Sequence, residues 1–174
     1  MELPRDLLKM IEEDERVLWS GRPEFKPFIL KSMGVVIVPL LFIVFFSSFF
    51  LYFRIPLIFP VLIFMVLWFG ILGIMLLKSI LYPPLLWRNL YYVITNKRIL
   101  VRKGVVGIDY DVLSLEYVRR AYIDRGLWDK IYNTGTIVIE AIGVTPVRFY
   151  SIPDPLEAHK RLLEALRESE TRKI

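Results

Sequence analysis

Two uncharged runs decide the fold of this chain: SMGVVIVPLLFIVFFSSFFLYF at residues 32–53 and IPLIFPVLIFMVLWFGILGIMLL at residues 55–77, separated by Arg54. Each run exceeds the roughly 20 apolar residues that an α-helix needs to cross a bilayer. A helix also satisfies its own backbone hydrogen bonds, which lipid cannot do. The sequence therefore predicts a transmembrane helical hairpin with its turn at residues 53–56. Two buried helices of a soluble core are the alternative, but the rest of the chain is too small to enclose them.

The predicted hairpin divides the chain into three parts. Residues 1–27 form an N-terminal segment, residues 28–81 contain the hairpin, and residues 82–174 are long enough for one small folded domain. We expect Tyr82, Pro83 and Pro84 to end the second span, with Tyr82 and Trp87 in the aromatic belt of the membrane interface.

The N-terminal segment carries the pattern of a short amphipathic helix of about three turns. Its apolar face consists of Leu3, Leu7, Met10 and Ile11, and acidic residues follow at positions 12–15. An acidic polar face suits packing on the folded domain better than lying on an anionic membrane surface. A short strand-like segment follows at residues 16–20.

The basic residues predict the topology. Six of the 23 Lys and Arg residues lie in residues 1–31, Arg54 lies in the turn, and the other 16 follow from Lys78 onward. Basic residues near membrane spans are retained in the cytoplasm, so we expect a cell-membrane protein with two spans and both termini cytoplasmic. The basic excess after the hairpin fits contact with anionic lipid headgroups, but this topology alone also accounts for it.

Composition excludes several classes of function. The chain has no cysteine, which rules out disulfides, thiolate metal sites and a cysteine nucleophile. The two apolar runs contain no Asp, Glu or His, which counts against a pump, a transporter or an intramembrane enzyme. The first 27 residues lack the apolar core of a cleaved signal peptide. We expect no nucleic-acid partner, because a dense basic face and a reading motif are both missing.

The domain after the hairpin has a β-rich pattern. Strand-like segments occur at residues 90–95, 98–102, 105–115, 118–123, 136–141 and 147–150. Asn96 and Lys97 form a predicted two-residue turn between the first two of these segments. About six or seven antiparallel strands must close into a barrel or a sandwich.

A helix closes the chain. Asp154 is the predicted N-cap, Pro155 takes the first helical position, and Glu157 completes a capping box. The expected apolar stripe consists of Leu156, Leu163 and Leu166, flanked by Leu162. The fold class is therefore α+β and mainly β: a two-helix transmembrane hairpin plus a small antiparallel β domain capped by a C-terminal α-helix.

No catalytic or metal-binding motif stands out. His159 is the only histidine and has no second ligand at metal-site spacing. Asp109 and Asp111 lack a third ligand and read as solvated strand charges. The serines lack a nucleophile elbow and no glycine-rich phosphate loop precedes a helix. We therefore expect no enzyme activity, no cofactor and no metal.

Four stretches of the chain resemble bacterial and archaeal pleckstrin-homology-like membrane proteins. They are ERVLWSGRP at residues 15–23, YVITNKRI at residues 92–99 followed by Gly104, GLWDKIYNTGTI at residues 126–137, and IPDP at residues 152–155. One departure is Asn133, where the family usually has glycine in a turn. The resemblance implies a split barrel of seven strands capped by the C-terminal helix, and no established enzymatic activity.

The first hairpin of the domain carries a cluster of basic residues. The cluster consists of Lys97, Arg98, Arg102 and Lys103. Period two places Arg98 and Arg102 on one face of the strand and Lys103 on the other. Eukaryotic relatives of the resembled fold often bind phosphoinositide headgroups through basic residues on their first hairpin. These four residues are therefore the candidate lipid-headgroup site, and a solvated or leaflet-facing edge is the alternative.

The leading functional hypothesis is a membrane-anchored binding or scaffold module at the cytoplasmic membrane face. The alternative is a sensor of anionic lipid headgroups that uses the basic hairpin. An enzyme of unknown type ranks last. The expected partners are membrane lipid and other membrane proteins. A second copy of the chain is among them, because a two-helix hairpin buries little helix surface alone.

Overall fold

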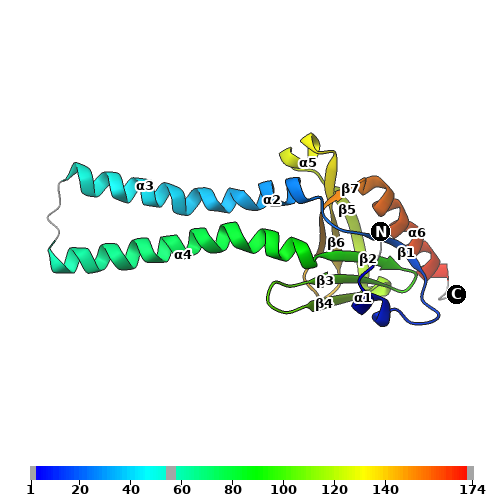
Figure 1. Cartoon of the computed structure of the whole chain (residues 1–174). Helices are drawn as coiled ribbons and strands as arrows, with labels where there is room; N and C mark the ends of the chain where they lie inside the picture. The colour runs from blue at the N-terminus through cyan, green and yellow to red at the C-terminus, as the bar shows by residue number, and fades with distance from the viewer. Residues whose placement is uncertain (1–2, 54–57, 172–174) are drawn as a thin grey trace. The chain divides into compact units, whose positions relative to one another are not determined.

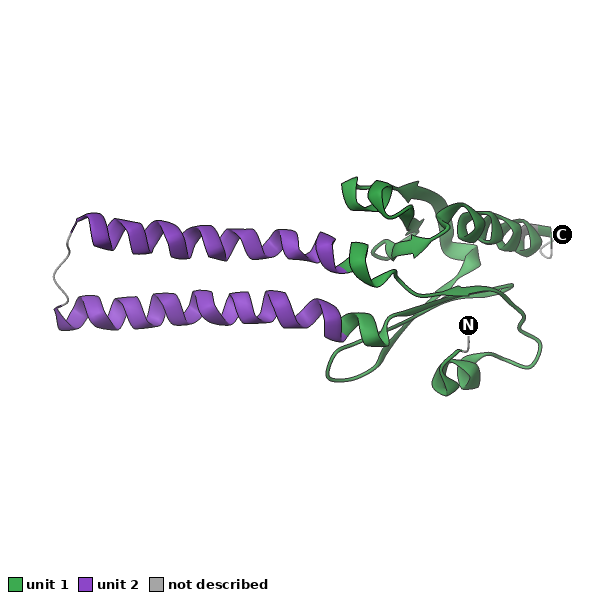
Figure 2. Ribbon diagram, turned by 45° about the horizontal axis from the view of Figure 1, so that its top comes forward, with its two compact units in different colours: residues 1–28, 86–174 green, residues 29–85 purple. Residues whose placement is uncertain are grey.

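The structure, a computed structural model, describes residues 3–53 and 58–171. The chain divides into two compact units. Unit 1 consists of residues 1–28 and 86–174, and unit 2 consists of residues 29–85 (Figure 2). The N-terminal segment and the domain after the hairpin therefore belong to the same unit.

The two apolar runs form the predicted long helices. The first comprises α2 (Phe25–Met33), a 3₁₀ turn η1 (Gly34–Val36) and α3 (Ile37–Tyr52), and the second is α4 (Phe59–Asn89). Pro39 cannot donate a hydrogen bond to the preceding turn, which accounts for the tighter 3₁₀ geometry there. Of the predicted turn at residues 53–56, Phe53 ends α3 and the rest lies outside the described residues.

We expected Tyr82, Pro83 and Pro84 to end the second span, and the helix itself is longer than that span. Helix α4 continues through both prolines to Asn89. The last turn of α4 belongs to unit 1, where the Trp87 indole packs edge-on against Phe25 with ring centroids 4.9 Å apart. The Trp87 Nε1 atom also donates a hydrogen bond to the Pro23 carbonyl at 2.8 Å.

Unit 1 contains seven antiparallel strands in two sheets (Figure 1). The first sheet has the order β1 (Val17–Gly21), β2 (Tyr91–Thr95), β3 (Arg98–Lys103) and β4 (Asp109–Ser114). The second has the order β5 (Val118–Asp124), β6 (Thr134–Ala141) and β7 (Val147–Pro153). The short helices α1 (Arg5–Met10), η2 (Leu115–Tyr117) and α5 (Leu127–Ile131) and the final helix α6 (Pro155–Thr171) complete the unit. The predicted fold class is confirmed.

The core of unit 1 follows from strand alternation. Tyr92 and Ile94 on β2 point to one face of the first sheet and are fully buried. The Tyr92 ring stacks on Phe149 of β7 at a centroid distance of 4.5 Å, and this contact joins the two sheets. Burial raises the pKa of the Tyr92 hydroxyl, which accepts a hydrogen bond from the Tyr150 N–H at 3.0 Å.

The opposite face of the first sheet is covered by α1. Leu7 is fully buried and packs with Val93 and Leu100, as its apolar face predicted. The helix is shorter than the expected three turns, because Ile11 adopts an extended conformation and ends it. The acidic residues that follow therefore lie in a loop instead of on the back of a helix.

The final helix starts as predicted but buries a different stripe. Asp154 caps it, and its Oδ1 atom accepts a hydrogen bond from the Glu157 N–H at 3.4 Å. Leu156 and Leu163, however, are 65% and 40% exposed. The buried face consists of Ala158, Leu162 and Ala165. Alanines let a helix approach a sheet closely, so Ala158 and Ala165, with Leu162 between them, determine which face turns inward.

The turn before β6 explains the departure at Asn133. This residue has φ of 52°, in the left-handed region. Glycine adopts that conformation without cost, and asparagine is among the side chains that tolerate it best. Asn133 therefore preserves the turn that glycine makes elsewhere in the resembled family.

We expect Leu7→Ala to lower the free energy of unfolding of unit 1 by about 2–5 kcal/mol, because it leaves a cavity between α1 and the first sheet. Urea unfolding of the full chain in detergent micelles, followed by tryptophan fluorescence, measures the loss. Leu8→Ala is the matched control, since Leu8 is 51% exposed, and it should cost no more than about 0.5 kcal/mol. Equal losses for both variants would contradict this packing.

Candidate functional site

The four residues of the predicted basic cluster do not form one site. Lys97 lies in the turn between β2 and β3, and the other three lie on β3. Arg98 and Arg102 point toward the N-terminal segment, where each bonds a carboxylate. Lys103 lies on the opposite face and pairs with Asp111. Each of the four basic side chains is thus paired with a carboxylate of this chain.

The pair between Arg98 and Glu15 is the most buried of these contacts. The Arg98 Nη2 atom lies 2.9 Å from Glu15 Oε2, and Arg98 Nε lies 3.1 Å from Glu15 Oε1. The Glu15 side chain is 0% exposed and also accepts a hydrogen bond from Thr95 Oγ1 at 2.6 Å. Arg98 Nη2 donates a further bond to the Met10 carbonyl at 2.9 Å. This bidentate pair links the loop after α1 to the hairpin formed by β2 and β3.

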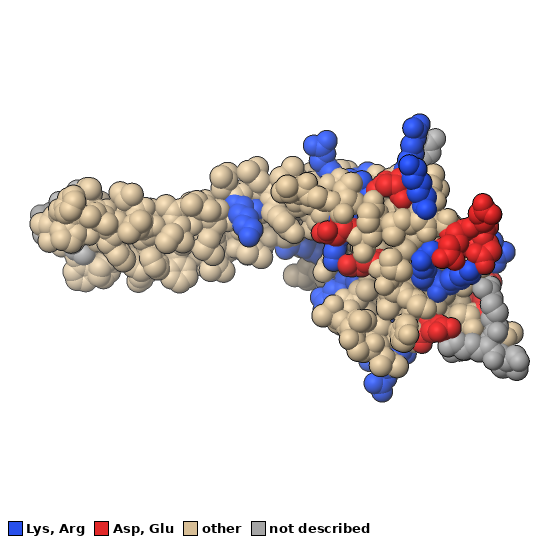
Figure 3. All heavy atoms as spheres, turned by 90° about the horizontal axis from the view of Figure 1, so that it is seen from below, with Lys and Arg blue, Asp and Glu red and all other residues tan. Residues whose placement is uncertain are grey.

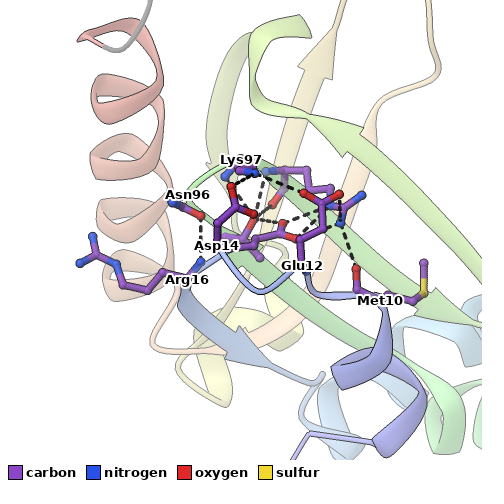
Figure 4. A network of polar contacts seen from close by, with 9 residues as sticks. Met10, Glu12, Asp14, Arg16, Asn96 and Lys97 are labelled. Atoms are coloured by element: carbon purple, nitrogen blue, oxygen red, sulfur yellow. Dashed lines mark hydrogen bonds and ion pairs between the residues drawn. The ribbon is translucent and has the colours of Figure 1, made fainter.

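A more exposed pair lies beside it (Figure 4). The Lys97 ammonium contacts Asp14 at 2.6 Å and Glu12 at 3.2 Å. The side chain of Asn96 accepts a hydrogen bond from the Arg16 N–H at 2.9 Å. Exposed ion pairs of this kind are screened by solvent and contribute little to stability. Lys97 is therefore held far less firmly than Arg98.

Arg102 is anchored where α1 meets the end of α4. Its Nε atom lies 2.6 Å from Asp6 Oδ2, and its Nη1 atom donates to the Asn89 carbonyl at 3.1 Å. The Tyr110 hydroxyl donates to the same Asp6 oxygen. Arg102 is buried, so it holds α1 and the last turn of α4 against β3.

The electrostatics of these pairs favour their charged forms. For Glu15, desolvation by burial is the largest influence and would raise the pKa, but hydrogen bonds from Arg98, Thr95 and the Glu12 N–H outweigh it and hold the pKa below its ordinary value. The hydrogen bond from Tyr110, aided by Arg102, lowers the pKa of Asp6 against the effect of burial. The hydrogen bond to Glu15 raises the pKa of Arg98.

These pairs limit what the hairpin can bind. An anion that took Arg98 would leave the Glu15 carboxylate buried without its main partner, which costs several kcal/mol. Lys97 and Lys103 lose only surface pairs, and their side chains are 34% and 43% exposed. Of the four predicted residues, these two lysines are the ones that an anionic ligand could recruit at low cost.

Sequence reasoning missed a second basic group, at Arg22. Its guanidinium lies over the Trp87 ring, 3.8 Å from the ring centroid, and 5.2 Å from the centroid of Tyr91. Such cation–π contacts gain strength when desolvated. Within unit 1, this stack ties the segment before α2 to the last turn of α4 and to the start of β2. The sequence signal was Arg22 itself, within the ERVLWSGRP stretch at residues 15–23, and nothing local to it indicates its aromatic partners.

The remaining candidates have structural roles. His159 Nε2 lies 3.2 Å from the Ala121 carbonyl and links α6 to β5. Asp111 pairs with Lys103, whereas Asp109 is exposed. Within residues 3–53 and 58–171, no group of three or more Asp, Glu or His side chains could hold a metal ion.

Comparison with known protein families gives a match over most of the chain. The family model described as "Bacterial PH domain" matches residues 28–166, which is most of the chain. The match includes α3 and α4 as well as the strands from β2 to β7. No curated protein and no solved structure matches.

We expect the charged Glu15 carboxylate to stabilise the fold in a pH-dependent way. Its pKa is depressed in the folded state, so the stabilisation is complete above the ordinary value of 4.5 and is lost as the pH falls below it. Glu15→Gln should lower the free energy of unfolding by about 1–3 kcal/mol at neutral pH. The variant should also flatten the decline below pH 4.5. Urea unfolding of the full chain in micelles at several pH values measures both effects.

Glu13→Gln is the control for this experiment, because Glu13 is exposed on the same loop. It should leave both the stability at neutral pH and the acid decline of the unaltered chain in place. If Glu15→Gln behaved like Glu13→Gln, the buried pair would contribute no net stability.

Proposed function

The chain belongs to the bacterial PH domain family, and from that premise we propose that it is a membrane-anchored binding or scaffold module at the cytoplasmic membrane face. The proposal rests on two apolar helices, which interrupt this domain in the sequence between β1 and β2. They run over Phe25–Tyr52 and Phe59–Asn89, with 28 and 31 residues. Each is long enough to cross a bilayer.

The environment of these helices supports the membrane role. In the most apolar stretch of each helix, 6% of the residues are buried within the protein, which argues against helices in the core of a soluble domain. The face seen in Figure 3 shows almost no charged side chains along them, whereas charges gather on unit 1. Apolar helices exposed on this scale need a lipid surrounding.

The distribution of basic residues supports a cytoplasmic location for both termini. Basic residues occur on both sides of the helix pair in the sequence, and a single one, Arg54, lies between the two helices. Basic residues close to spans stay on the cytoplasmic side. Unit 1 then lies at the cytoplasmic face.

Binding rather than chemistry is the activity that this arrangement suits. A PH-like domain is a binding and scaffold fold and is not typically catalytic. A tether raises the effective concentration of the domain toward partners in the same membrane, so weak contacts suffice. Other membrane proteins, or a second copy of this chain, are the partners that the proposal favours.

The second candidate is a sensor of anionic headgroups through the basic hairpin. The observation in its favour is that Lys97 and Lys103 make only surface ion pairs, from which lipid phosphates can recruit them. Arg98 and Arg102 belong to the same predicted site, but their internal pairs make them poor residues for a test, since their loss would disturb the fold. A test of this candidate therefore uses the two lysines.

The topology can be read with single cysteines, because the chain contains none. We expect Tyr52→Cys, at the exposed end of α3, to react with a membrane-impermeant thiol reagent in intact cells. Lys160→Cys, exposed on α6, should react only after the membrane is permeabilised. Labelling of Lys160→Cys in intact cells would reverse the proposed orientation, and failure of the chain to remain in alkali-washed membranes would refute the anchoring.

Headgroup binding can be separated from protein binding in nanodiscs that hold the full chain. If the hairpin senses lipid, anionic lipid should protect Lys97 and Lys103 from an amine-reactive reagent, and salt should remove the protection. The leading proposal expects equal labelling in zwitterionic and anionic nanodiscs. Mass spectrometry quantifies the modified lysines, with Lys160 on α6 as the internal control. Salt-sensitive protection confined to the two hairpin lysines would favour the sensor.

A further inference from the structure

Helix α5 buries a polar side chain and exposes apolar ones, the opposite of what is usual for a domain in water. Asp129 is fully buried, and its carboxylate accepts hydrogen bonds from the Gly126 N–H at 3.0 Å and from Thr134 Oγ1 at 2.8 Å. The apolar side chains on and just after the helix point outward instead. Leu127 is 80% and Ile131 is 68% exposed. Trp128 and Tyr132 are also exposed beside them.

A second exposed apolar group lies in the loop between β3 and β4. Gly104 has φ of 136°, and a Cβ atom there would lie 2.0 Å from the Gly107 carbonyl oxygen. Only glycine therefore fits this tight turn. The turn leaves Val106 fully exposed at its tip, with Ile108 half exposed next to it.

Both groups lie at one end of unit 1, the end from which α2 and α4 leave. The Asn89 side chain, at the end of α4, donates a hydrogen bond to the Gly104 carbonyl at 3.0 Å. Ser151 accepts a backbone bond from Glu24, the residue before α2, at 2.8 Å, and its hydroxyl lies 3.4 Å from the Asp129 carboxylate. Within unit 1, Figures 1 and 2 both place α5 and the β3–β4 loop at this end, while α6 extends toward the other.

We propose that this apolar end, made of Val106, Ile108, Leu127, Trp128, Ile131 and Tyr132, inserts into the interfacial layer of the bilayer that the helices span. The inference rests on the proposed function, since it requires a membrane anchor. The two joints to the apolar helices lie at the same end of the unit, so the chain itself brings this surface to the membrane. The occupant that the surface meets is lipid.

The composition of the apolar end fits that occupant. Tryptophan and tyrosine are enriched at membrane interfaces, where an apolar ring and a polar tip meet both media. The exposed charges within residues 125–132 are Arg125 and Lys130, both cationic, and cations near the surface are attracted to anionic leaflets. Interfacial segments of this kind reach about 5–10 Å into the boundary between headgroups and acyl chains.

Insertion would give the domain a fixed orientation. Two contacts, at α5 and at the β3–β4 loop, together with the two helix joints, define a plane rather than a single point of attachment. The side of unit 1 that carries α6 would then face the cytoplasm, where a protein partner can reach it. The membrane contact and the partner surface would thus be different faces of one small domain.

The test uses the full chain in lipid vesicles with an environment-sensitive fluorophore on one introduced cysteine. Ile131→Cys and Val106→Cys report on the apolar end, and Arg167→Cys, exposed near the C-terminal end of α6, is the control. We expect the first two probes to emit at shorter wavelength than the control and to lose most of their emission to a shallow lipid-borne quencher. The control probe should respond only to a water-soluble quencher.

A probe at Val44→Cys, exposed in the middle of α3, separates this inference from the proposed function. One outcome is that a deep acyl-chain quencher quenches the Val44 probe while the Ile131 and Val106 probes respond only to the water-soluble quencher. In that case the apolar end does not insert, and the membrane anchor still stands. If the water-soluble quencher also quenches the Val44 probe, the proposed membrane anchor is refuted as well. Shielding of Ile131 from the aqueous quencher without lipid quenching would assign the surface to contact with a second copy of the chain and overturn the proposal.

Discussion

The pairing of β1 with β2 is the constraint on which the rest of the structure depends. These strands are neighbours in the first sheet, with Gly21 opposite Tyr92, yet the whole helix pair separates them in the sequence. The chain therefore leaves unit 1 and returns to it at adjacent points. Strands paired by hydrogen bonds must lie on the same side of a membrane. A chain that crosses a membrane between them must consequently do so an even number of times, and two apolar helices meet that condition.

The contacts around these two points explain why the joint is made of aromatic and cationic residues. Arg22 lies over the Trp87 ring, and the Trp87 indole donates to the Pro23 carbonyl. Phe28 is buried and lies edge-on to Tyr150 of β7. A planar guanidinium can stack and donate hydrogen bonds at the same time, so one side chain links both segments. The helix ends are thus part of the fold of unit 1 and not loose tethers to it.

Much of this fold could be predicted from the sequence, because its main signals are local. The apolar runs, the turn at Asn96 and Lys97, and the cap at Asp154 each depend on neighbouring residues. The ion pair of Glu15 with Arg98 joins residues 83 positions apart, and no local pattern indicates it. The acidic residues after α1 were expected to form the back of a helix, and their role as partners of the basic hairpin appeared only once Ile11 was seen to end the helix. The prediction of the buried face of α6 was wrong for a related reason. Leucine is a good indicator of an apolar face, but the two buried alanines determine how closely the helix can approach the sheet.

The orientation of α5 follows from the same competition between local pattern and tertiary contacts. Four apolar residues in a five-residue helix and the position after it would normally turn toward the core. Here the Asp129 carboxylate takes that place, because a buried carboxylate needs every hydrogen bond that Gly126, Thr134 and Ser151 supply. Once this side is fixed, the 3.6-residue period carries Leu127 and Ile131 outward. In water such an arrangement leaves apolar area exposed with nothing gained, whereas at a membrane surface the same outward side chains become a contact. The buried carboxylate is thus the feature that makes the exposed apolar face unavoidable, and the membrane is the surrounding in which that face is favourable.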